Sequence, residues 1–522
     1  MRSVTVPAFN DIRNPPQAVP LMTKCEGLRS NRKDLINDKE DNMDNNNMVP
    51  QQEPDRQYYY MDEMKKLVLE KSREAGRTLT YNVTTFGCQM NAHDSEKLKG
   101  ILEACGFEET GEEDGADFVL LNTCTIRENA NTRLYGHLGQ LKAIKRGRPD
   151  MVIALCGCMM QEPHVIEAIK NKYRHVDVVF GTFNIYKLAE LLYKYYVNKE
   201  RVIEVLETHA GAVETLPQKR KFGFKAGVNI MYGCNNFCTY CIVPYVRGRE
   251  TSRTPEEIMN EVRLLVKSGV KEIMLLGQNV NSYGIAGGDI GGFTGMSFPE
   301  LIKMVAEEPG VERLRFMTSH PKDLSDELIE VIRTHENICR HIHLPVQSGS
   351  NDVLKKMNRR YTKESYLALV DRIRKAVPDI SLTTDIIVGF PGETEEDFLD
   401  TLDVVERVKY DQAFTFIYSK RTGTPAASFE DQVDEAVIKD RFDRLLDKVN
   451  TIAHREMKRF EGRVCDVLVE EKNRQEEGLV TGRTSENVTV HFKGDASIIG
   501  STVKVLMKEA KGFYYMGEIK DE

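Results

Sequence analysis

Three cysteines stand close together in the segment YGCNNFCTYC, directly after an apolar run that predicts a strand. They are Cys234, Cys238 and Cys241, in a C-x3-C-x2-C array. Three thiolates at this spacing can hold three irons of a four-iron cluster and leave the fourth iron open to a ligand. A structural zinc site would need a fourth protein ligand nearby, and the candidate histidines, His209 and His320, are remote in sequence. The array therefore favours a cluster with an open iron over a zinc site or three packed thiols.

A second set of cysteines is spread along the N-terminal part of the chain. Cys88, Cys124 and Cys158 each follow an apolar, β-branched run, at 80–86, 116–122 and 151–157. Ligands of an open α/β sheet gather at the carboxyl ends of its strands, so these thiols can converge. Simple burial is the alternative. Cys156 competes with Cys158 for the same role, but its place within the strand predicts that it faces the core.

The composition of the chain limits the classes of protein to which it can belong. The chain has 522 residues with 41% hydrophobic and 29% charged side chains, 11 cysteines and a formal charge of -8. It can build several domains and is not coated with positive charge. It contains no apolar stretch of membrane-spanning length, and its start lacks an apolar core of signal-peptide length. We therefore expect a cytoplasmic protein with no membrane partner, and a disulfide framework is not expected there. The remaining cysteines are interpreted as structural or incidental: Cys25, Cys105, Cys156, Cys339 and Cys465.

The elements that must position these thiols form three predicted domains after a disordered tail, 1–57, rich in Asn, Asp and Gln. Strands alternate with helices over 79–196, which predicts a parallel α/β domain. Six further strand–helix units over 220–452 predict a partial (β/α)6 barrel, open on one side. Their strands are expected at 226–231, 272–277, 313–318, 341–346, 381–387 and 413–418. Five short strands over 455–522 predict a small β-barrel.

The array at Cys234, with an aromatic residue before its last cysteine, resembles the radical S-adenosylmethionine superfamily over about 225–420. The chain also has cysteines in FGCQMN, NTC and GCM contexts and a C-terminal barrel of the kind called TRAM. With these features it resembles the methylthiotransferases over about 79–522. The resemblance implies two [4Fe-4S] clusters, one on each cysteine triad, and S-adenosylmethionine bound at the open iron. All six cysteines would be catalytic. Further implied cofactor contacts at strand ends, with ordinary turn residues as the alternative, are Tyr240, Gly277, Gln347, Ser348, Asp385 and Gly389.

The segments FGCQMN and CTYCIVPYVRGRETSR most resemble the branch that acts on tRNA. That branch adds a methylthio group to C2 of N6-isopentenyladenosine (N6-dimethylallyladenosine) beside the anticodon, with two S-adenosylmethionine molecules used per product. The alternatives are threonylcarbamoyladenosine in tRNA, an aspartate of a ribosomal protein, and a non-catalytic iron–sulfur protein that binds RNA or transfers electrons. The implied partners are a tRNA anticodon stem-loop and an electron donor such as flavodoxin or ferredoxin, with the chain acting as a monomer.

A local excess of positive charge flanks the array of Cys234, Cys238 and Cys241. Seven basic residues and one acidic residue, Glu250, lie between Leu216 and Arg253. Such a stretch can bind RNA phosphates, and a solvated linker is the alternative. The RNA-binding candidates are Lys221, Arg247, Arg249, Arg253 and, in the C-terminal barrel, Arg483, with Phe492 and Tyr514 as possible stacking residues. A second basic group, which includes Arg359, could equally be a helix surface or a contact with RNA or the cofactor.

Overall fold

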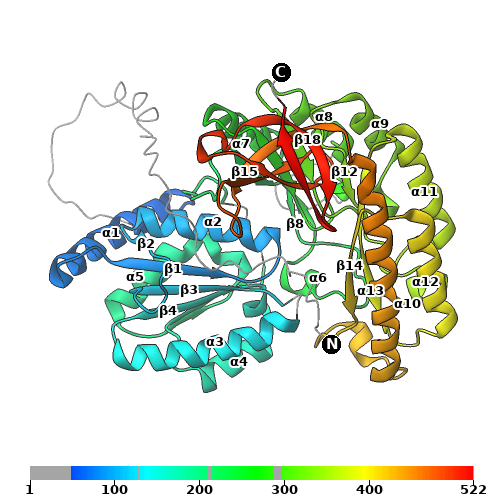
Figure 1. Ribbon diagram of the computed structural model, residues 1–522. Helices are drawn as coiled ribbons and strands as arrows, with labels where there is room; N and C mark the ends of the chain where they lie inside the picture. Colours follow the sequence, from blue (N-terminus) through cyan, green and yellow to red (C-terminus); the bar gives the residue numbers. More distant parts are fainter. Residues whose placement is uncertain (1–48, 126–127, 209–212, 286–294, 521–522) are drawn as a thin grey trace.

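The computed structural model describes residues 49–125, 128–208, 213–285 and 295–520. Most of the predicted tail, Cys25 and His209 therefore lie outside the described residues. Three bodies are visible in Figure 1: an α/β domain in blue to cyan, a larger α/β region in green to orange, and a red barrel. Among the described helices, none combines the length and the apolar character that a bilayer span requires.

The N-terminal domain is a six-stranded parallel sheet in the order β2-β1-β3-β4-β5-β6. Its strands are β1 (Thr80–Thr85), β2 (Glu108–Glu109), β3 (Phe118–Thr123), β4 (Val152–Gly157), β5 (Val178–Phe180) and β6 (Val202–Glu204). Its helices are α1 (Asp55–Ala75), α2 (Gln89–Ala104), α3 (Glu128–Gly147), α4 (Pro163–Lys172) and α5 (Leu188–Asn198). Helices α1, α2 and α5 cover one face and α3 and α4 the other, because successive strand residues point to opposite faces.

Helix α1 is an integral part of this domain. Tyr60, Met61, Met64 and Val68 are buried and join the core beneath α2 and α5. The folded chain therefore begins before the predicted boundary at residue 79, and α1 overlaps the end of the predicted tail. Strand β6 likewise extends the sheet beyond residue 196, the predicted end of this domain, because its short apolar run pairs with β5.

The central region is the predicted open barrel, built from two three-stranded parallel sheets, β11-β10-β7 and β12-β13-β14. An isolated bridge between Leu314 and Ile338 connects them. The strands are β7 (Lys225–Asn229), β10 (Glu272–Leu276), β11 (Arg313–Phe316), β12 (His341–His343), β13 (Ser381–Val388) and β14 (Gln412–Ile417). Two short strands, β8 (Met231–Tyr232) and β9 (Thr251–Ser252), form a separate antiparallel pair. Strands β7 and β14 each have a single partner among the described strands, so the barrel is open between them.

Helices cover the outside of this barrel. They are α7 (Pro255–Lys267), α8 (Phe298–Ala306), α9 (Asp326–Thr334), α10 (Asn351–Lys356), α11 (Lys363–Ala376), α12 (Glu395–Val408) and α13 (Glu435–Met457). The short helix α6 (Val243–Val246) lies instead between this region and the N-terminal domain. Helices α7 and α12 begin with capping boxes, Thr254 with Glu257 and Thr394 with Asp397. The six predicted strands are thus confirmed, and their carboxyl ends lie together.

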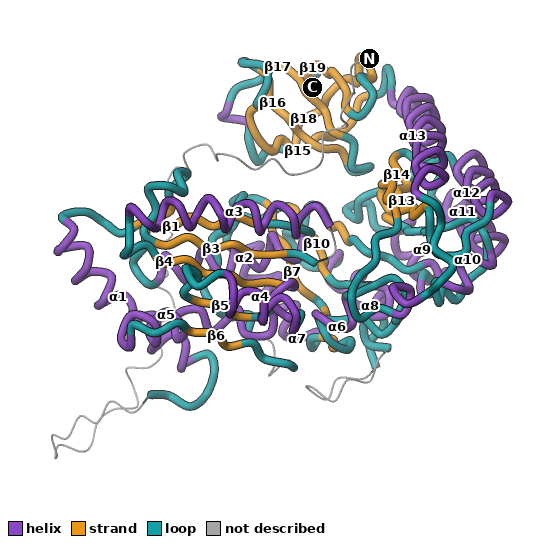
Figure 2. Tube along the Cα trace, turned by 90° about the horizontal axis from the view of Figure 1, so that it is seen from below, coloured by secondary structure: helices purple, strands orange, loops and turns teal. Residues whose placement is uncertain are grey.

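The C-terminal module is a closed five-stranded barrel in the order β15-β16-β17-β19-β18, as predicted. Its strands are β15 (Val464–Lys472), β16 (Leu479–Thr484), β17 (Thr489–Lys493), β18 (Thr502–Ala510) and β19 (Tyr514–Ile519). Figure 2 shows this barrel standing apart from the N-terminal domain and connected to the central region through α13. It packs on the amino ends of the central strands, where Lys225 pairs with Glu470 of β15 over 2.6 Å.

Candidate functional site

The three N-terminal cysteines meet at the carboxyl edge of the first sheet. Cys88 precedes α2, Cys124 follows β3, and Cys158 opens the 3-10 turn after β4. Close approach is built into the backbone at Gly87, whose φ is +112°, because a Cβ there would lie 2.5 Å from Cβ of Cys124. The predicted convergence of the three chain segments is therefore confirmed.

Asn91 is the polar centre of this edge, and the sequence reasoning missed it. Its Oδ1 lies 3.9 Å from Sγ of Cys88 and 3.7 Å from Sγ of Cys158. Its amide donates hydrogen bonds to the carbonyls of Phe86 and Thr123, over 2.9 and 2.8 Å. The side chain is fully buried. Asn91 therefore fixes the loops that carry two of the cysteines, and its place three residues after Cys88 was the available signal.

Cys156 takes no part in this cluster of thiols. It is fully buried and belongs to the apolar core on the face of the sheet covered by α1, α2 and α5. The prediction that Cys158, and not Cys156, faces the site is consistent with this burial. A two-residue spacing along a strand would ordinarily keep both on one face, but Gly157, with φ +97°, turns the chain between them.

The second triad lies on the loop after β8. The backbone N–H of Cys234 donates to the carbonyl of Gly248 over 3.2 Å, and that of Cys241 donates to the carbonyl of Cys238 over 2.9 Å. Arg359 is buried here, and its guanidinium donates to Sγ of Cys238 over 3.5 Å and to the carbonyl of Pro345 over 2.9 Å. The second basic group thus supplies one side chain, that of Arg359, that contacts this loop.

Both triads suit clusters better than single ions. Burial raises the pKa of the thiols of Cys158 and Cys241 to about 12 and of Cys234 to about 11, so each needs positive charge to ionise. A bound metal supplies that charge. Among the described residues, no three Cys, His, Asp or Glu side chains stand close enough to hold one metal ion. A cubane binds each thiolate through a different iron and therefore suits a more open triad.

The two triads approach each other across the domain interface. Cys158 packs against Ile242, the residue before helix α6, and against Val246, the last residue of α6; both follow Cys241 closely in the chain. Arg247, the next residue, donates from Nε to Sγ of Cys158 over 3.1 Å. One short helix therefore joins the cofactor loop of the central region to the sulfur-rich edge of the N-terminal domain.

The predicted cofactor contacts lie at the carboxyl ends of the central strands. Gln347 has φ +65° and pairs with both neighbours of Ile386 on β13, through Asp385 O and Ile387 N. Ser348 is fully buried, and its hydroxyl accepts from the backbone N–H of Ser350 over 3.2 Å. The structure thus gives Ser348 a role within its own turn, and its contact with S-adenosylmethionine stays a prediction.

Tyr240 and Gly277 flank the same end of the barrel. Tyr240 packs on an apolar group that contains Met357 and Phe390. A Cβ at Gly277 would lie 2.5 Å from the side chain of Met231, so only glycine allows this turn to approach the strand beside it. Cofactor binding by these two residues remains a prediction.

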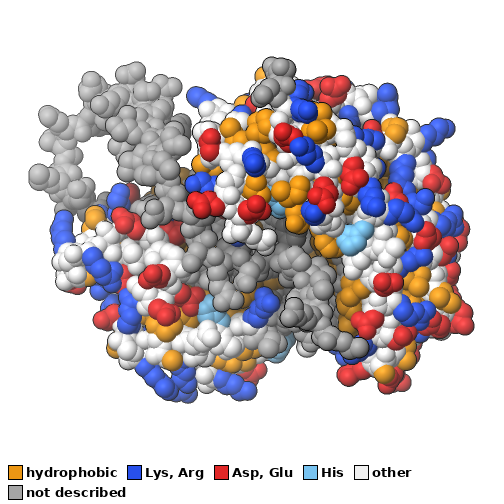
Figure 3. Space-filling view, viewed as in Figure 1, with side chains coloured by type: hydrophobic (Ala, Val, Ile, Leu, Met, Phe, Trp, Pro, Cys, Tyr) orange, Lys and Arg blue, Asp and Glu red, His pale blue; other side chains and the backbone are white. Residues whose placement is uncertain are grey.

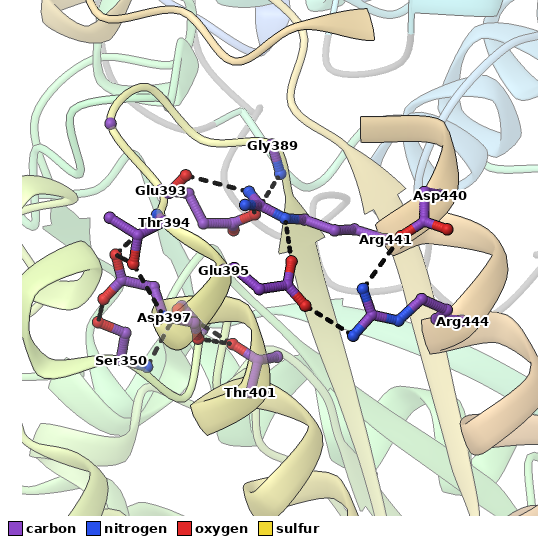
Figure 4. Close-up of polar contacts among 12 residues, drawn as sticks. Ser350, Gly389, Glu393, Thr394, Glu395, Asp397, Thr401, Asp440, Arg441 and Arg444 are labelled. Carbon is purple, nitrogen blue, oxygen red and sulfur yellow. Dashed lines mark hydrogen bonds and ion pairs between the residues drawn. The ribbon is translucent and has the colours of Figure 1, made fainter. Parts of the chain in front are cut away.

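The loop between β13 and α12 is anchored by a helix from far along the chain. Gly389 has φ +72°, and its N–H donates to Glu393 over 3.1 Å. Arg441 of α13 donates to the same Glu393 carboxylate over 2.9 Å and to its carbonyl over 3.0 Å. Figure 4 shows this arginine between Glu393 and Glu395, beside the capping box at Thr394. The loop that carries Gly389 is therefore held in one place, a role for Arg441 that no local sequence pattern signals.

Two buried asparagines near this end have side-chain atoms without a hydrogen-bond partner among the described residues. Asn281 lies in the turn after β10, and neither its amide nitrogen nor its oxygen has a hydrogen-bond partner among the described residues. Oδ1 of Asn279 is likewise without one. Buried polar groups are nearly always satisfied, so these atoms mark where a polar ligand fits. The sequence reasoning pointed to the segment 277–279, but it named only Gly277 as a contact and did not reach Asn281.

The inner face of the open barrel presents polar and aromatic side chains. Nε2 of His343 lies 3.5 Å from Oδ2 of Asp385, and the His343 ring stands 5.9 Å from that of Phe414. Phe416, two residues along the edge strand β14, shares this face and is 40% exposed. An exposed ring beside the barrel opening is a surface on which a planar base can stack.

The basic stretch behaves differently from the prediction. Arg247 and Arg253 are buried at 5% and 7% exposure, and they pair with Asp94 over 2.9 Å and with Glu261 over 2.7 Å. The prediction that they contact RNA is therefore wrong, because no phosphate can reach them. Lys221 and Arg249 are exposed. Outside the part covered by grey atoms, Figure 3 shows basic and acidic side chains interspersed on the visible face.

The C-terminal barrel gives a mixed result. Phe492 is fully buried in the barrel core, so the prediction that it stacks on bases is wrong. Tyr514 is partly exposed, with its ring 4.6 Å from that of His491. Arg483 is 19% exposed and lies 3.5 Å from Glu470. RNA contact by Arg483 and Tyr514 stays a prediction.

Family models match all three domains. Residues 80–181 match the uncharacterized protein family UPF0004, residues 228–405 the radical SAM superfamily, and residues 458–520 the TRAM domain. Among solved structures, the radical S-adenosylmethionine methyltransferase TsrM from Kitasatospora setae covers 67% of this chain and 77% of its own. That match has 15% identity and a TM-score of 0.47. It is too partial to bear on the activity.

Full-length relatives are much closer. The tRNA-2-methylthio-N(6)-dimethylallyladenosine synthase of Lachnoclostridium phytofermentans is 61% identical over 449 residues, which cover 86% of this chain and 97% of the relative. The protein of the same name from Acetivibrio thermocellus is 54% identical over 471 residues, or 90% and 97%. The chain therefore belongs to the radical S-adenosylmethionine methylthiotransferases, in the family of the tRNA-2-methylthio-N(6)-dimethylallyladenosine synthases.

Proposed function

We propose that this enzyme replaces the hydrogen at C2 of N6-dimethylallyladenosine, beside the anticodon of tRNA, with a methylthio group. The observation that carries the proposal is the contact between the two cysteine triads through α6 and Arg247. Methylthiolation needs a hydrogen-abstracting cofactor and a sulfur source side by side. The relatives that share this chain over nearly their whole length carry the name of this activity.

Two [4Fe-4S] clusters fit the site, one on Cys234, Cys238 and Cys241 and the other on the N-terminal triad. With S-adenosylmethionine bound, these groups supply the radical chemistry that an unactivated C2–H bond requires and the methylated sulfur that replaces the hydrogen. Asn279, Asn281 and Gln347 are placed to bind the polar parts of S-adenosylmethionine, since they stand at the carboxyl ends of the strands.

The protein itself contributes by positioning the reacting groups and by excluding water from the site. Gly233 and Gly248 let the cofactor loop fold back on itself, because a Cβ at Gly233 would lie 2.1 Å from the carbonyl of Arg249. The buried side of the N-terminal triad is closed by Ile242 and Val246. A reactive radical is protected in such a water-poor setting.

The tRNA would enter through the gap between β7 and β14, with the target adenosine turned out of the anticodon loop. Phe416 offers a stacking surface there, and Lys221 and Arg249 offer exposed positive charge. Arg249 also stacks over the ring of Phe237 at 4.3 Å, which pre-orients its guanidinium. An electron donor of the flavodoxin or ferredoxin type, a monomeric state and a cytoplasmic location complete the proposal.

The test is anaerobic turnover with reconstituted protein, S-adenosylmethionine, reductant and tRNA bearing N6-dimethylallyladenosine. We expect about eight irons per chain, 5′-deoxyadenosine, and the methylthio nucleoside by mass spectrometry of digested tRNA. Unmodified tRNA and tRNA bearing threonylcarbamoyladenosine serve as controls. Product with the threonylcarbamoyl substrate alone would overturn the assignment of the base, and iron for a single cluster would overturn the two-cluster enzyme.

A further inference from the structure

Two adjacent residues touch both cysteine triads. The carbonyl of Gly248 accepts the N–H of Cys234 over 3.2 Å, while Nε of Arg247 donates to Sγ of Cys158 over 3.1 Å. Chain positions 158 and 234 belong to different domains. The Arg247–Gly248 dipeptide is therefore a direct link between a ligand of each proposed cluster.

The guanidinium of Arg247 is fixed from several sides. Besides Cys158, it donates from its terminal nitrogen to Oδ1 of Asn91 over 2.8 Å and to Oδ2 of Asp94 over 2.9 Å. The residue is 5% exposed, and its backbone ends α6 through a 2.8 Å bond to the carbonyl of Val243. Because the planar guanidinium is held from several sides, its Nε–H points at Sγ of Cys158.

The ion pair with Asp94 does not by itself explain the orientation of the Arg247 guanidinium. An ion pair between the two domains would need only the terminal nitrogen that faces Asp94. Nε faces the sulfur instead, and the same Asn91 that contacts Arg247 also contacts Cys88 and Cys158. The arrangement directs positive charge and a hydrogen-bond donor at the N-terminal triad, beyond what domain docking requires.

We propose that Arg247 is a positioning residue of the N-terminal cluster: its N–H bond to Cys158 fixes that ligand and raises the reduction potential of the cluster. This inference rests on the proposed two-cluster function. A donor and a positive charge beside a ligating sulfur stabilise the more negative, reduced state of a cluster. The link also sets the distance between the sulfur-bearing cluster and the cofactor loop.

The test isolates the N-terminal cluster in the full chain by replacing Cys234, Cys238 and Cys241 with alanine. In this background, we compare R247M, R247K and the double variant D94N/R247M by iron content, redox titration and electron paramagnetic resonance. The double variant removes both charges, so it avoids leaving Asp94 buried and unpaired. We expect D94N/R247M to move the reduction potential to a more negative value and to change the resonance spectrum, with R247K falling between it and the parent.

Arg253→Met is the matched control, since Arg253 is a similarly buried arginine of the same stretch whose described side-chain hydrogen bonds go to Asn229 and Glu261, with no cysteine among these partners. It should leave the potential unchanged. Loss of the cluster in D94N/R247M but not in R253M would also support the positioning role. Parent-like potential and spectrum in D94N/R247M would overturn the inference about Arg247. Absence of iron from the background protein itself would instead overturn the two-cluster function.

Discussion

Nε of Arg313 lies 2.9 Å from Oε2 of Glu272, at the amino ends of neighbouring strands in the central barrel. The same guanidinium donates to the carbonyl of Thr484 in the C-terminal barrel over 2.9 Å. Arg315 and Lys225 also contact Glu272, over 3.0 and 2.9 Å. A single carboxylate thus holds three cations that together fasten the C-terminal barrel to the central region.

Glu272→Gln should destabilise the protein strongly near neutral pH. Glu272 is 1% exposed, and its loss removes the carboxylate partner of the buried Arg313 and Arg315, which costs about 3–5 kcal/mol for a broken buried pair. Thermal unfolding followed by circular dichroism measures the effect. Glu307→Gln is the control, because its pair with Lys303 is exposed, and such pairs contribute about 0–1 kcal/mol. Equal melting curves for the two variants would contradict the assigned role.

The effect of Glu272 should depend on pH with a definite sign. Burial raises the pKa of this carboxyl, but Arg315, Lys225 and Arg313 more than offset that and hold it well below its usual range. A lowered carboxyl pKa stabilises the fold above the unfolded value, about 4.3, and this contribution is lost as pH falls toward the folded value. The stability difference between parent and E272Q should therefore shrink as the pH drops below about 4. A constant difference down to acid pH would contradict the linkage.

Cys156, on β4, and Cys158, just after it, should respond differently to alanine. Cys158→Ala should remove about half of the iron and abolish the methylthio product, while 5′-deoxyadenosine still forms at the cluster on the other triad. Cys156→Ala should keep full iron and lose only about 0.5–3 kcal/mol of stability, as a core substitution. Iron assay and product analysis on the same preparations distinguish them. Iron loss in C156A with retention in C158A would reverse the assignment.

Much of the fold and both triads could be predicted, because the signals are local. The strands that precede Cys88, Cys124 and Cys158 are short β-branched runs, and parallel topology then places these three cysteines at one edge. The short strands β2 and β6 were not predicted. The burial of Arg247 and its ion pair could not be predicted, since its partner Asp94 lies 153 positions away in another domain. A run of basic residues looks the same whether each one faces solvent or finds a distant carboxylate.

Helix α1 illustrates the same limit. Its sequence predicts a helix, but not the surface against which it packs. Met64→Ala should destabilise the N-terminal domain by about 2–5 kcal/mol, because the Met64 side chain is fully buried in the core of that domain. Leu69→Ala, five residues along and 46% exposed, should change stability by less than about 0.5 kcal/mol. Chemical denaturation compares the two, and equal effects would show that α1 is not part of the folded domain.

Phe416 should contribute to tRNA binding without contributing to cofactor assembly. Its ring is 40% exposed on the inner face of β14, the edge strand beside the barrel opening, and it touches no cysteine loop in the described contacts. Base–aromatic stacking is worth about 1–3 kcal/mol per base. Phe416→Ala should therefore raise the KM or Kd for modified tRNA by the corresponding factor, with unchanged iron content. Leu399→Ala is the matched control, because Leu399 is 48% exposed on helix α12, outside the barrel. If F416A bound tRNA as tightly as L399A, the entry of the target base beside β14 would have to be abandoned.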